Sequence, residues 1–282
     1  MKVLLSGGAN PILEMHSLTD ELQKRGVEVS FPSRLPGLDE IDDAFWEQYS
    51  DADLLYYRTG LGDALKFELS KKIGPNIRVI NREVLNNALL SNKLYQALQA
   101  QKVGVKIPVT VPNRNNFAEL KNKLGVPFVL KGTNGIQGKE VFLIKDEEGY
   151  LSTHGTIKGD VLSQEMIPND GDYRVFVVGG KVSDIFKRVP VAGDFKANIS
   201  QGGSGIPVVD EELREKLSEM ALKITNQLKL DIAGIDIIRH SETGELYFIE
   251  SNVNPGWKGL DEALGENTAA KIADWFVSLI RT

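Results

Sequence analysis

Residues 232–255, IAGIDIIRHSETGELYFIESNVNP, contain two apolar segments of strand length joined by a short polar turn. Asp236 interrupts the first segment, and Glu250 and Asn252 lie at the end of the second. Because side chains two positions apart on a strand point to the same face, Glu250 and Asn252 are expected to project together. Whether Asp236 joins them depends on the length of the turn, which sets the register of the hairpin.

A turn of three residues, 242–244, pairs Ser241 with Glu245, and counting back along both strands then places Asp236 opposite Glu250. This geometry is a type I turn followed by a bulge, and it favours glycine in its third, left-handed position, as the sequence has here. A turn of two or four residues would send the two carboxylates to opposite faces of the sheet. The turn chemistry therefore predicts that the three polar side chains converge.

The converging oxygen atoms favour a metal ion. Two carboxylates and one amide on an otherwise apolar sheet are costly to bury without compensating partners. A set of oxygen ligands with few protein members suits Mg²⁺, which keeps water molecules and takes phosphate oxygens for its remaining positions. These residues alone leave open the alternative of a solvated strand end with capping acids.

Two lysines lie where phosphate groups could be bound. Lys93 opens a predicted helix, and Lys131 ends the apolar strand PFVLK directly before the glycine-rich stretch GTNGIQG, residues 132–138. Glycine-rich loops let backbone N–H groups approach phosphate oxygens, and a lysine adds a positive charge. The glycines match neither the Walker pattern nor the dinucleotide fingerprint, so an ordinary hairpin turn is the alternative.

The strand and helix pattern divides the chain into three parts. Residues 1–92 alternate strands with helices, which predicts a parallel sheet covered by helices, with strands at 2–6, 27–31, 53–57 and 78–80. Residues 93–167 are expected to form a small central lobe around the glycine-rich stretch, with strands at 107–111, 127–131 and 140–144. Residues 168–282 are expected to form a larger antiparallel region whose first hairpin turns at Gly179-Gly180.

Composition and charge exclude several classes of protein. The net charge of −6 argues against a dedicated binder of nucleic acid or of anionic membranes. The chain has no cysteine, which excludes disulfides, zinc–thiolate sites and thiol catalysis. The apolar run at the N-terminus is too short for a signal peptide, and no segment approaches the length of a membrane span. A cytoplasmic enzyme is the resulting expectation.

Five segments, in chain order, resemble the ATP-grasp superfamily: PFVLKGTNGIQG, SQEMIPNDGDYRVFVVGGKV, FKRVPVAGDFKANISQGGSG, AGIDIIR and FIESNVNPGWKG. Within it they are most similar to the RimK-like carboxylate–amine ligases, which include the ribosomal-protein glutamate ligase and the LysX-like ligases. The resemblance runs from about Ser91 to the C-terminus, and more loosely through the first lobe. It implies an ATP-grasp fold of α/β and α+β type: an N-terminal parallel α/β lobe, a small mobile central lid and a C-terminal antiparallel α+β lobe.

The resemblance implies a nucleotide site. Lys93 and Lys131 would contact the α- and β-phosphates of ATP, the glycine-rich stretch would cover the triphosphate, and the hinge 164–167 would receive adenine. Asp172 would hold the ribose hydroxyls. The complete predicted nucleotide-binding set is Lys93, Lys131, Gly135, Gly138, Gln164, Glu165, Met166, Ile167, Asp172, Lys196 and Asn198.

The resemblance also implies catalytic and metal-binding residues. Arg174 and Arg188 would be the catalytic side chains that line the acyl-phosphate region. Two Mg²⁺ ions, with Mn²⁺ as an alternative, would be held by Asp236, Glu250 and Asn252, in agreement with the hairpin argument above.

The implied activity is ATP-dependent ligation of a carboxylate and an amine through an acyl phosphate, with release of ADP and phosphate. The partners would be small-molecule or peptide acids and amines, and a homo-oligomer, either dimer or tetramer, is compatible with the family. Two alternatives are a peptide- or protein-modifying ligase that extends a tail or cross-links side chains, and a nucleotide-binding module without turnover. Gln201 stands where close relatives carry arginine, so the substrate group recognised there is expected to be uncharged.

Overall fold

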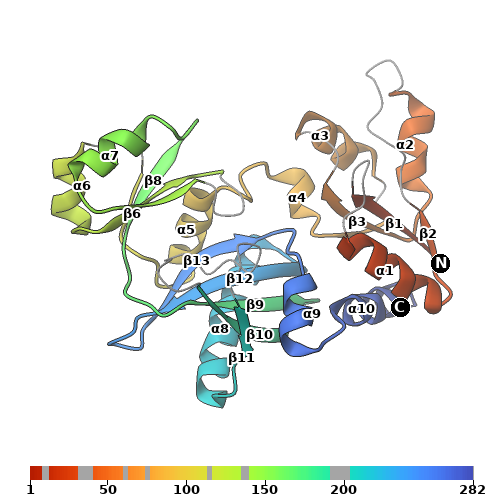
Figure 1. The fold of residues 1–282 in the computed structure, drawn as a ribbon. Coiled ribbons are helices and arrows are strands. Elements are labelled where there is room, and N and C mark those ends of the chain that lie inside the picture. The colour runs from red at the N-terminus through yellow and green to blue at the C-terminus, as the bar shows by residue number, and fades with distance from the viewer. Residues whose placement is uncertain are drawn as a thin grey trace.

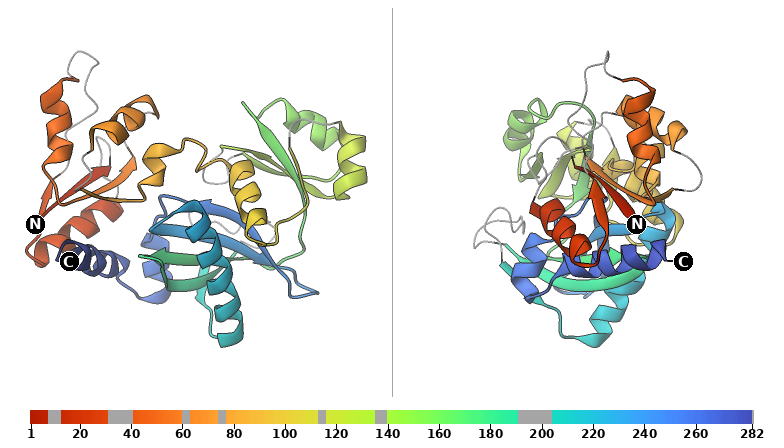
Figure 2. Two further views of the ribbon diagram at one scale, coloured as in Figure 1. Left: turned by 180° about the vertical axis from the view of Figure 1, so that it is seen from behind. Right: turned by 90° about the vertical axis from the view of Figure 1, so that its right-hand side faces the viewer.

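The computed structural model describes residues 1–7, 13–30, 41–59, 63–73, 77–112, 116–134, 140–190 and 204–281. Within these ranges the strands form three separate sheets (Figure 1), which Figure 2 shows from two further sides. The N-terminal sheet lies at the right of Figure 1, the C-terminal sheet at its lower centre, and a small central sheet at its upper left. The chain passes from the first sheet towards the other two through helices α4 (Glu83–Asn86) and α5 (Lys93–Lys102).

The N-terminal sheet is parallel and has the order β2-β1-β3-β4. Its strands are β1 (Lys2–Gly7), β2 (Glu28–Ser30), β3 (Leu54–Thr59) and β4 (Arg78–Ile80). One face packs against α1 (Leu13–Lys24) and the C-terminal helix α10 (Thr268–Ile280), and the other against α2 (Asp43–Ser50) and α3 (Asp63–Lys72). Because both faces are buried, the middle of β1 and β3 is continuously apolar instead of alternating.

The small sheet is antiparallel and has the order β5-β8-β6-β7. It consists of β5 (Thr110–Pro112), β6 (Phe128–Gly132), β7 (Val141–Ile144) and β8 (Val161–Glu165), with helices α6 (Phe117–Leu124) and α7 (Glu147–His154). Phe128 and Leu130 belong to a separate hydrophobic core under these helices. Val129 and Lys131 alternate with them along β6 and therefore line a cavity on the other face.

The C-terminal sheet is antiparallel and has the order β11-β10-β9-β12-β13. Its strands are β9 (Asp172–Val178), β10 (Lys181–Val189), β11 (Ser204–Pro207), β12 (Ile232–Arg239) and β13 (Leu246–Asn252). Helix α8 (Glu211–Leu228) packs against one face together with α5, while α9 (Lys258–Leu264) follows β13. The face away from α8 carries the polar side chains of the candidate site.

Several expectations from the sequence can be compared with the elements observed. The turn at Gly179-Gly180 is confirmed, because both residues have the positive φ, 60° and 72°, of a tight hairpin turn. The strand expected at 107–111 was wrong in its start, because β5 begins only at Thr110. Pro108 has no backbone N–H and so cannot donate to a strand neighbour.

Helix α8 was missing from the sequence interpretation, although its start carries a local signal. Asp210 is the N-cap, and its side chain accepts a hydrogen bond from the backbone N–H of Leu213. Glu211 and Glu212 lie in the first turn, where negative charge stabilises the helix dipole.

The predicted division into three lobes at residues 92 and 167 stays a prediction. Hydrophobic packing connects distant parts of the chain, because α10 shares a core with α1, and α5 packs against α8 and β13. None of the helices that the structure describes combines the length and apolar character needed to cross a bilayer.

Candidate active site

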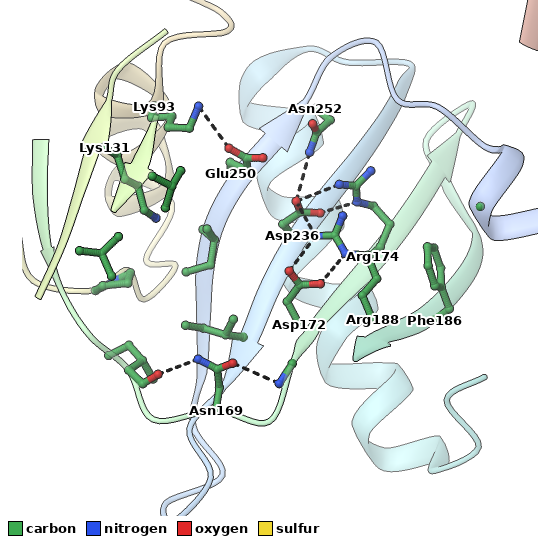
Figure 3. A pocket seen from close by; sticks show the side chains of 18 of the residues that line it. Lys93, Lys131, Asn169, Asp172, Arg174, Phe186, Arg188, Asp236, Glu250 and Asn252 are labelled. Carbon is green, nitrogen blue, oxygen red and sulfur yellow. Dashed lines mark hydrogen bonds and ion pairs between the residues drawn. The ribbon is translucent and has the colours of Figure 1, made fainter. Parts of the chain in front are cut away.

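A cavity of about 690 Å³ lies between the small sheet and the C-terminal sheet (Figure 3). Every predicted site residue within the described ranges lines it: Lys93, Lys131, Gln164, Glu165, Met166, Ile167, Asp172, Arg174, Arg188, Asp236, Glu250 and Asn252. Its apolar lining includes side chains that the sequence interpretation did not single out: Val129, Val141, Phe186, Ile238 and Ile249. The predicted residues come from both sheets and from α5, so the fold brings together segments far apart in the sequence.

The wall that the C-terminal sheet contributes to the cavity includes one row of side chains across four strands. The register places Phe186 beside Arg174, Arg174 beside Asp236, and Asp236 beside Glu250, on β10, β9, β12 and β13. Gly234 lies next in line on the same face of β12, where an added Cβ would come within 3.0 Å of the Arg174 Cδ atom. Glycine at this position therefore leaves room for the arginine to lie across the sheet.

The turn between β12 and β13 differs from the predicted one. The His240 N–H donates to the Glu245 carbonyl at 2.8 Å, and the Gly244 N–H donates to the His240 carbonyl at 2.9 Å, so the turn has four residues, 241–244. Gly244 has the predicted positive φ, 72°. The prediction of a three-residue turn was wrong, and a four-residue turn alone would have separated the carboxylates.

A β-bulge restores the register. The residue pairing of β13 with β12 shifts between Phe248 and Glu250, so Ile249 is an extra residue on β13. Phe248 therefore packs into the core under α8, while Glu250 faces the cavity opposite Asp236. The predicted convergence is confirmed, but the bulge produces it, because a shift of one residue exchanges the two faces of a strand.

Two arginines surround Asp236 in this structure (Figure 3). Arg174 donates to both carboxylate oxygens, and its Nη2 lies 2.9 Å from Oδ2. Arg188 Nη2 lies 2.8 Å from the same oxygen and also 2.8 Å from Asp172 Oδ2. Asn252 Nδ2 completes the group at 3.3 Å from Asp236 Oδ2. Asp172, the predicted ribose ligand, is thus paired with Arg188.

Burial and neighbouring charges shift the pKa values of Asp236, Asp172 and Arg188. Burial alone would raise the pKa of Asp236, but the positive charges of Arg174 and Arg188 outweigh it and hold this pKa below its usual value. Burial raises the pKa of Asp172, and Asp236 raises it further, against the opposing charge of Arg188. Burial would lower the pKa of Arg188, but the two carboxylates raise it above its usual value. The stability of this part of the sheet therefore depends on complete charge pairing.

The opposite wall of the cavity carries the two predicted lysines. Lys131 is 8% exposed, and its Nζ donates to Gln164 Oε1 at 2.8 Å. The Gln164 amide in turn donates to the Thr110 hydroxyl, so Gln164 orients the lysine. Burial lowers the pKa of Lys131 to about 8. Lys93 Nζ lies 3.4 Å from Glu250 Oε2 and connects α5 with β13.

The hinge between the two sheets is held by side chains that bond to the backbone. Glu165 Oε1 accepts a hydrogen bond from the Val109 N–H at 2.9 Å. Asn169, which the sequence interpretation missed, donates to the Ile167 carbonyl and accepts from the Gly171 N–H. The sequence signal for it is the turn-forming stretch PNDG after the hinge. The Glu165 carboxylate is therefore bonded to the backbone just before β5.

The side chains of the cavity supply only part of the oxygen ligands that a hard cation such as Mg²⁺ needs. Within the described ranges, no cluster of three or more His, Cys, Asp or Glu side chains is placed to hold a metal ion. Glu250 and Asn252 nevertheless present oxygen-bearing groups to the cavity beside Asp236, and a turn of the Asn252 amide would direct Oδ1 instead of Nδ2 towards that group. Such a set would leave several positions for water and phosphate oxygens, as Mg²⁺ requires.

Five residues of the sequence interpretation lie outside the described residues: Gly135, Gly138, Lys196, Asn198 and Gln201. Their predicted roles stay predictions. Thr133 and Asn134, the last described residues before the glycines, contact the start of α5: the Lys93 N–H donates to the Thr133 carbonyl at 2.9 Å.

Comparison with known proteins gives consistent similarities. The profile of the RimK-like ATP-grasp domain matches residues 89–276. A "Probable alpha-L-glutamate ligase" of Parasynechococcus marenigrum is 39% identical over 150 residues, covering 51% of this chain and 31% of that protein. A "Beta-citrylglutamate synthase B" of Danio rerio is 30% identical over 213 residues, covering 72% of this chain and 51% of that protein. The chain thus spans between about a third and a half of the length of these two relatives.

The fold is also similar to solved structures. The structure of the ATP-grasp ligase PsnB complexed with minimal precursor matches with a TM-score of 0.76 and 16% sequence identity, covering 98% of this chain and 99% of that chain. At this identity the similarity concerns the fold alone, and it confirms the predicted fold class.

Proposed function

Because the chain belongs to the RimK-like ATP-grasp family, whose profile matches residues 89–276, we propose that it is an ATP-dependent carboxylate–amine ligase. One observation supports the proposal most directly: lysines of one wall and carboxylates of the other face each other across a single cavity (Figure 3). Lys93 and Lys131 lie on one side, and Asp236 and Glu250 on the other. Such an arrangement can hold a nucleoside triphosphate with divalent cations.

In this proposal the adenine ring lies between apolar side chains of the two sheets, Val129, Val141, Ile238 and Ile249. The backbone at Met166 and Ile167 reads its edge, because the Glu165 carboxylate is already bonded to Val109. Lys131 and Lys93 then neutralise phosphate oxygens, Lys131 in the orientation that Gln164 gives it. Apolar walls with a few oriented polar groups are typical of cofactor sites.

Magnesium would be held by Glu250, Asn252 and Asp236, together with phosphate oxygens. The bound ion would supply charge neutralisation for the transferred phosphoryl group. Asp236 shares its oxygens with Arg174 and Arg188 in this structure, so these arginines would exchange part of that contact for the phosphate groups.

The proposed reaction has two steps, and the protein positions the reactants in both. An oxygen of the substrate carboxylate attacks the γ-phosphorus, the bond to the bridging oxygen of ATP breaks, and ADP leaves. The amine nitrogen then attacks the acyl carbon, the bond to phosphate breaks, and the nitrogen loses a proton. Arg174 and Arg188 provide positive charge beside the site of transfer, which stabilises the developing negative charge.

The test is release of ADP in the presence of ATP, Mg²⁺ and pairs of acids and amines. Glutamate belongs in the panel because the names of both relatives above contain it, and neutral amino acids and short peptides belong there because of Gln201. We expect ADP release to require one matched pair and to equal the amide formed. Tight nucleotide binding without ADP release from any pair would instead indicate a module without turnover.

The low pKa of Lys131 predicts a pH-dependent nucleotide affinity. Phosphate binding favours the protonated lysine, and its pKa is about 8 in the structure without nucleotide. The affinity for ADP should therefore fall as the pH rises above 8, by up to about tenfold per unit until the pKa of the bound form is reached. Titration calorimetry between pH 7 and 9.5 measures this. In Lys131→Gln the slope should disappear, and an unchanged slope would assign the effect to another group.

The small sheet is proposed to act as a lid that closes on nucleotide. It has a hydrophobic core of its own, built from residues such as Phe128 and Tyr150, so it can move as a body. Amide exchange of peptides covering β6 and β7 should slow when ADP and Mg²⁺ are added, because closure orders phosphate-binding segments. Peptides of α8 serve as the control, and equal exchange with and without nucleotide in β6 and β7 would contradict closure.

A further inference from the structure

Strand β13 carries two of the proposed metal ligands and lies at the edge of its sheet. Its inner edge pairs with β12, where Ser251 lies opposite Ile235. Among the residues that the structure describes, no strand pairs with its outer edge, so backbone groups there need other partners. Ser251 lies between Glu250 and Asn252, and any movement of its backbone would move both side chains.

The outer edge at Ser251 is paired by one side chain, that of Gln96. Gln96 Oε1 accepts from the Ser251 N–H at 2.9 Å, and Gln96 Nε2 donates to the Ser251 carbonyl at 2.8 Å. The same Nε2 donates to the Leu90 carbonyl at 2.8 Å, and the side chain is 2% exposed. A glutamine amide carries one acceptor and two donor hydrogens, and here all are used. Gln96 thus pairs with β13 as a residue of a neighbouring strand would.

We infer that Gln96 is a positioning residue of the site, which fixes the backbone of β13 so that Glu250 and Asn252 are held ready for magnesium. The inference rests on the proposed function, since it concerns how the proposed metal ligands are oriented. Groups that orient metal ligands without touching the metal commonly change its affinity by about 10–100-fold when they are removed.

The position of Gln96 in α5 supports this role. Lys93, one turn earlier, lies 3.4 Å from Glu250, so two residues of the same helix face contact the segment that carries the ligands. The cap of the helix, Asn92, donates to Asn134, which lies two residues after β6. The first turns of α5 therefore contact both walls of the cavity, and Gln96 is the point at which the helix is joined to β13.

Gln99 provides a matched control for a purely structural effect. It lies on the same helix and is 8% exposed. Its Oε1 accepts from Gln227 Nε2 at 2.9 Å, which joins α5 to α8 and not to β13. Loss of either glutamine removes hydrogen bonds that join α5 to a neighbouring segment, but only the loss of Gln96 removes the partner of the Ser251 backbone.

The experiment compares Gln96→Met with Gln99→Met and the unmodified chain. Binding of ADP is measured by calorimetry with and without Mg²⁺, and thermal unfolding is followed for all three. We expect both variants to unfold at lower temperature, and only Gln96→Met to lose about tenfold or more of the Mg²⁺-dependent part of the ADP affinity. Its affinity for ADP without Mg²⁺ should match that of Gln99→Met. Both variants keep Lys131 and the apolar side chains proposed to hold adenine, Val129, Val141, Ile238 and Ile249.

Equal Mg²⁺-dependent binding in the two variants would overturn the inference while leaving the proposed function intact. Absence of any Mg²⁺ effect in the unmodified chain would overturn the proposed function itself, and the inference with it. If Gln96→Met does not fold, Gln96→Asn is measured instead, because it keeps the amide but is too short to bond to both Leu90 and Ser251. The expected result is again a selective loss of Mg²⁺-dependent affinity, and equality with Gln99→Met would again overturn the inference.

Discussion

Replacing Glu250 with glutamine is expected to lower ATP turnover by about 10²–10³-fold, or on the order of 2.7–4 kcal/mol in the transition state. Glu250 faces the cavity beside Asn252, opposite Asp236 and 3.4 Å from Lys93. The substitution keeps the shape of the side chain but removes the charge that would hold magnesium next to the transferred phosphoryl group. Steady-state release of ADP, with the matched acid and amine, measures the effect.

The fold should survive this substitution, because Glu250 is partly exposed and its bulge is maintained by backbone pairing. Glu245→Gln is the matched control on the same hairpin: its carboxylate is half exposed and pairs with Lys106, away from the cavity. We expect Glu245→Gln to change turnover by no more than about twofold, as for other surface ion pairs. Turnover of Glu250→Gln close to that of the control would remove Glu250 from the metal site.

Strand periodicity is local and could predict that Glu250 and Asn252 share a face. The convergence of Asp236 with Glu250 was predicted through a three-residue turn that the structure does not have, so its actual cause, the bulge, was not predicted. The stretch LYFIE contains consecutive apolar residues, and nothing in them shows that Ile249 is the extra residue. The bulge is set by packing, since Phe248 enters the core under α8 while Glu250 faces the cavity. The position of the bulge can be assigned only when the residues that pack on both faces of the sheet are known.

The partners of the charged residues were not predictable either, for a related reason. Arg174 and Arg188 surround Asp236 because β9 lies between β10 and β12 in the sheet order, and strand order follows from the whole topology. Likewise, Lys131 meets Gln164 only because β6 pairs with β8. The family motifs identified residues that line one cavity, whereas their hydrogen-bond partners required the three-dimensional arrangement.

Replacing Arg188 with methionine is expected to destabilise the protein by about 3–5 kcal/mol, the range for breaking a buried ion pair on one side. Arg188 is 6% exposed and contacts Asp172 and Asp236. Methionine fills a similar volume but offers no charge, so Asp172 and Asp236 lose the cation that contacts both of them. Denaturant unfolding at pH 7 measures the loss.

Arg78→Met is the matched control, because this arginine is half exposed and pairs with Asp231 at the surface. Its cost should be about 0–1 kcal/mol, as for exposed ion pairs. A loss in Arg188→Met no larger than in Arg78→Met would show that the buried pairing does not stabilise the sheet.

The pH dependence of the free energy of unfolding tests independently whether the loss in Arg188→Met comes from unpaired charge. Burial already raises the pKa of Asp172 in the unmodified protein, and removal of the Arg188 charge should raise it further. An acid whose pKa is higher in the folded than in the unfolded state binds more protons when folded, so its folded form gains stability as the pH falls towards the unfolded value. The lowered pKa of Asp236 in the unmodified protein costs stability only below about pH 4, so it does not contribute between pH 7 and pH 5. The difference between Arg188→Met and the unmodified protein should therefore shrink from pH 7 to pH 5, and adding Asp172→Asn should recover part of it at pH 7. A difference that is constant with pH would mean that methionine disturbs packing and not charge.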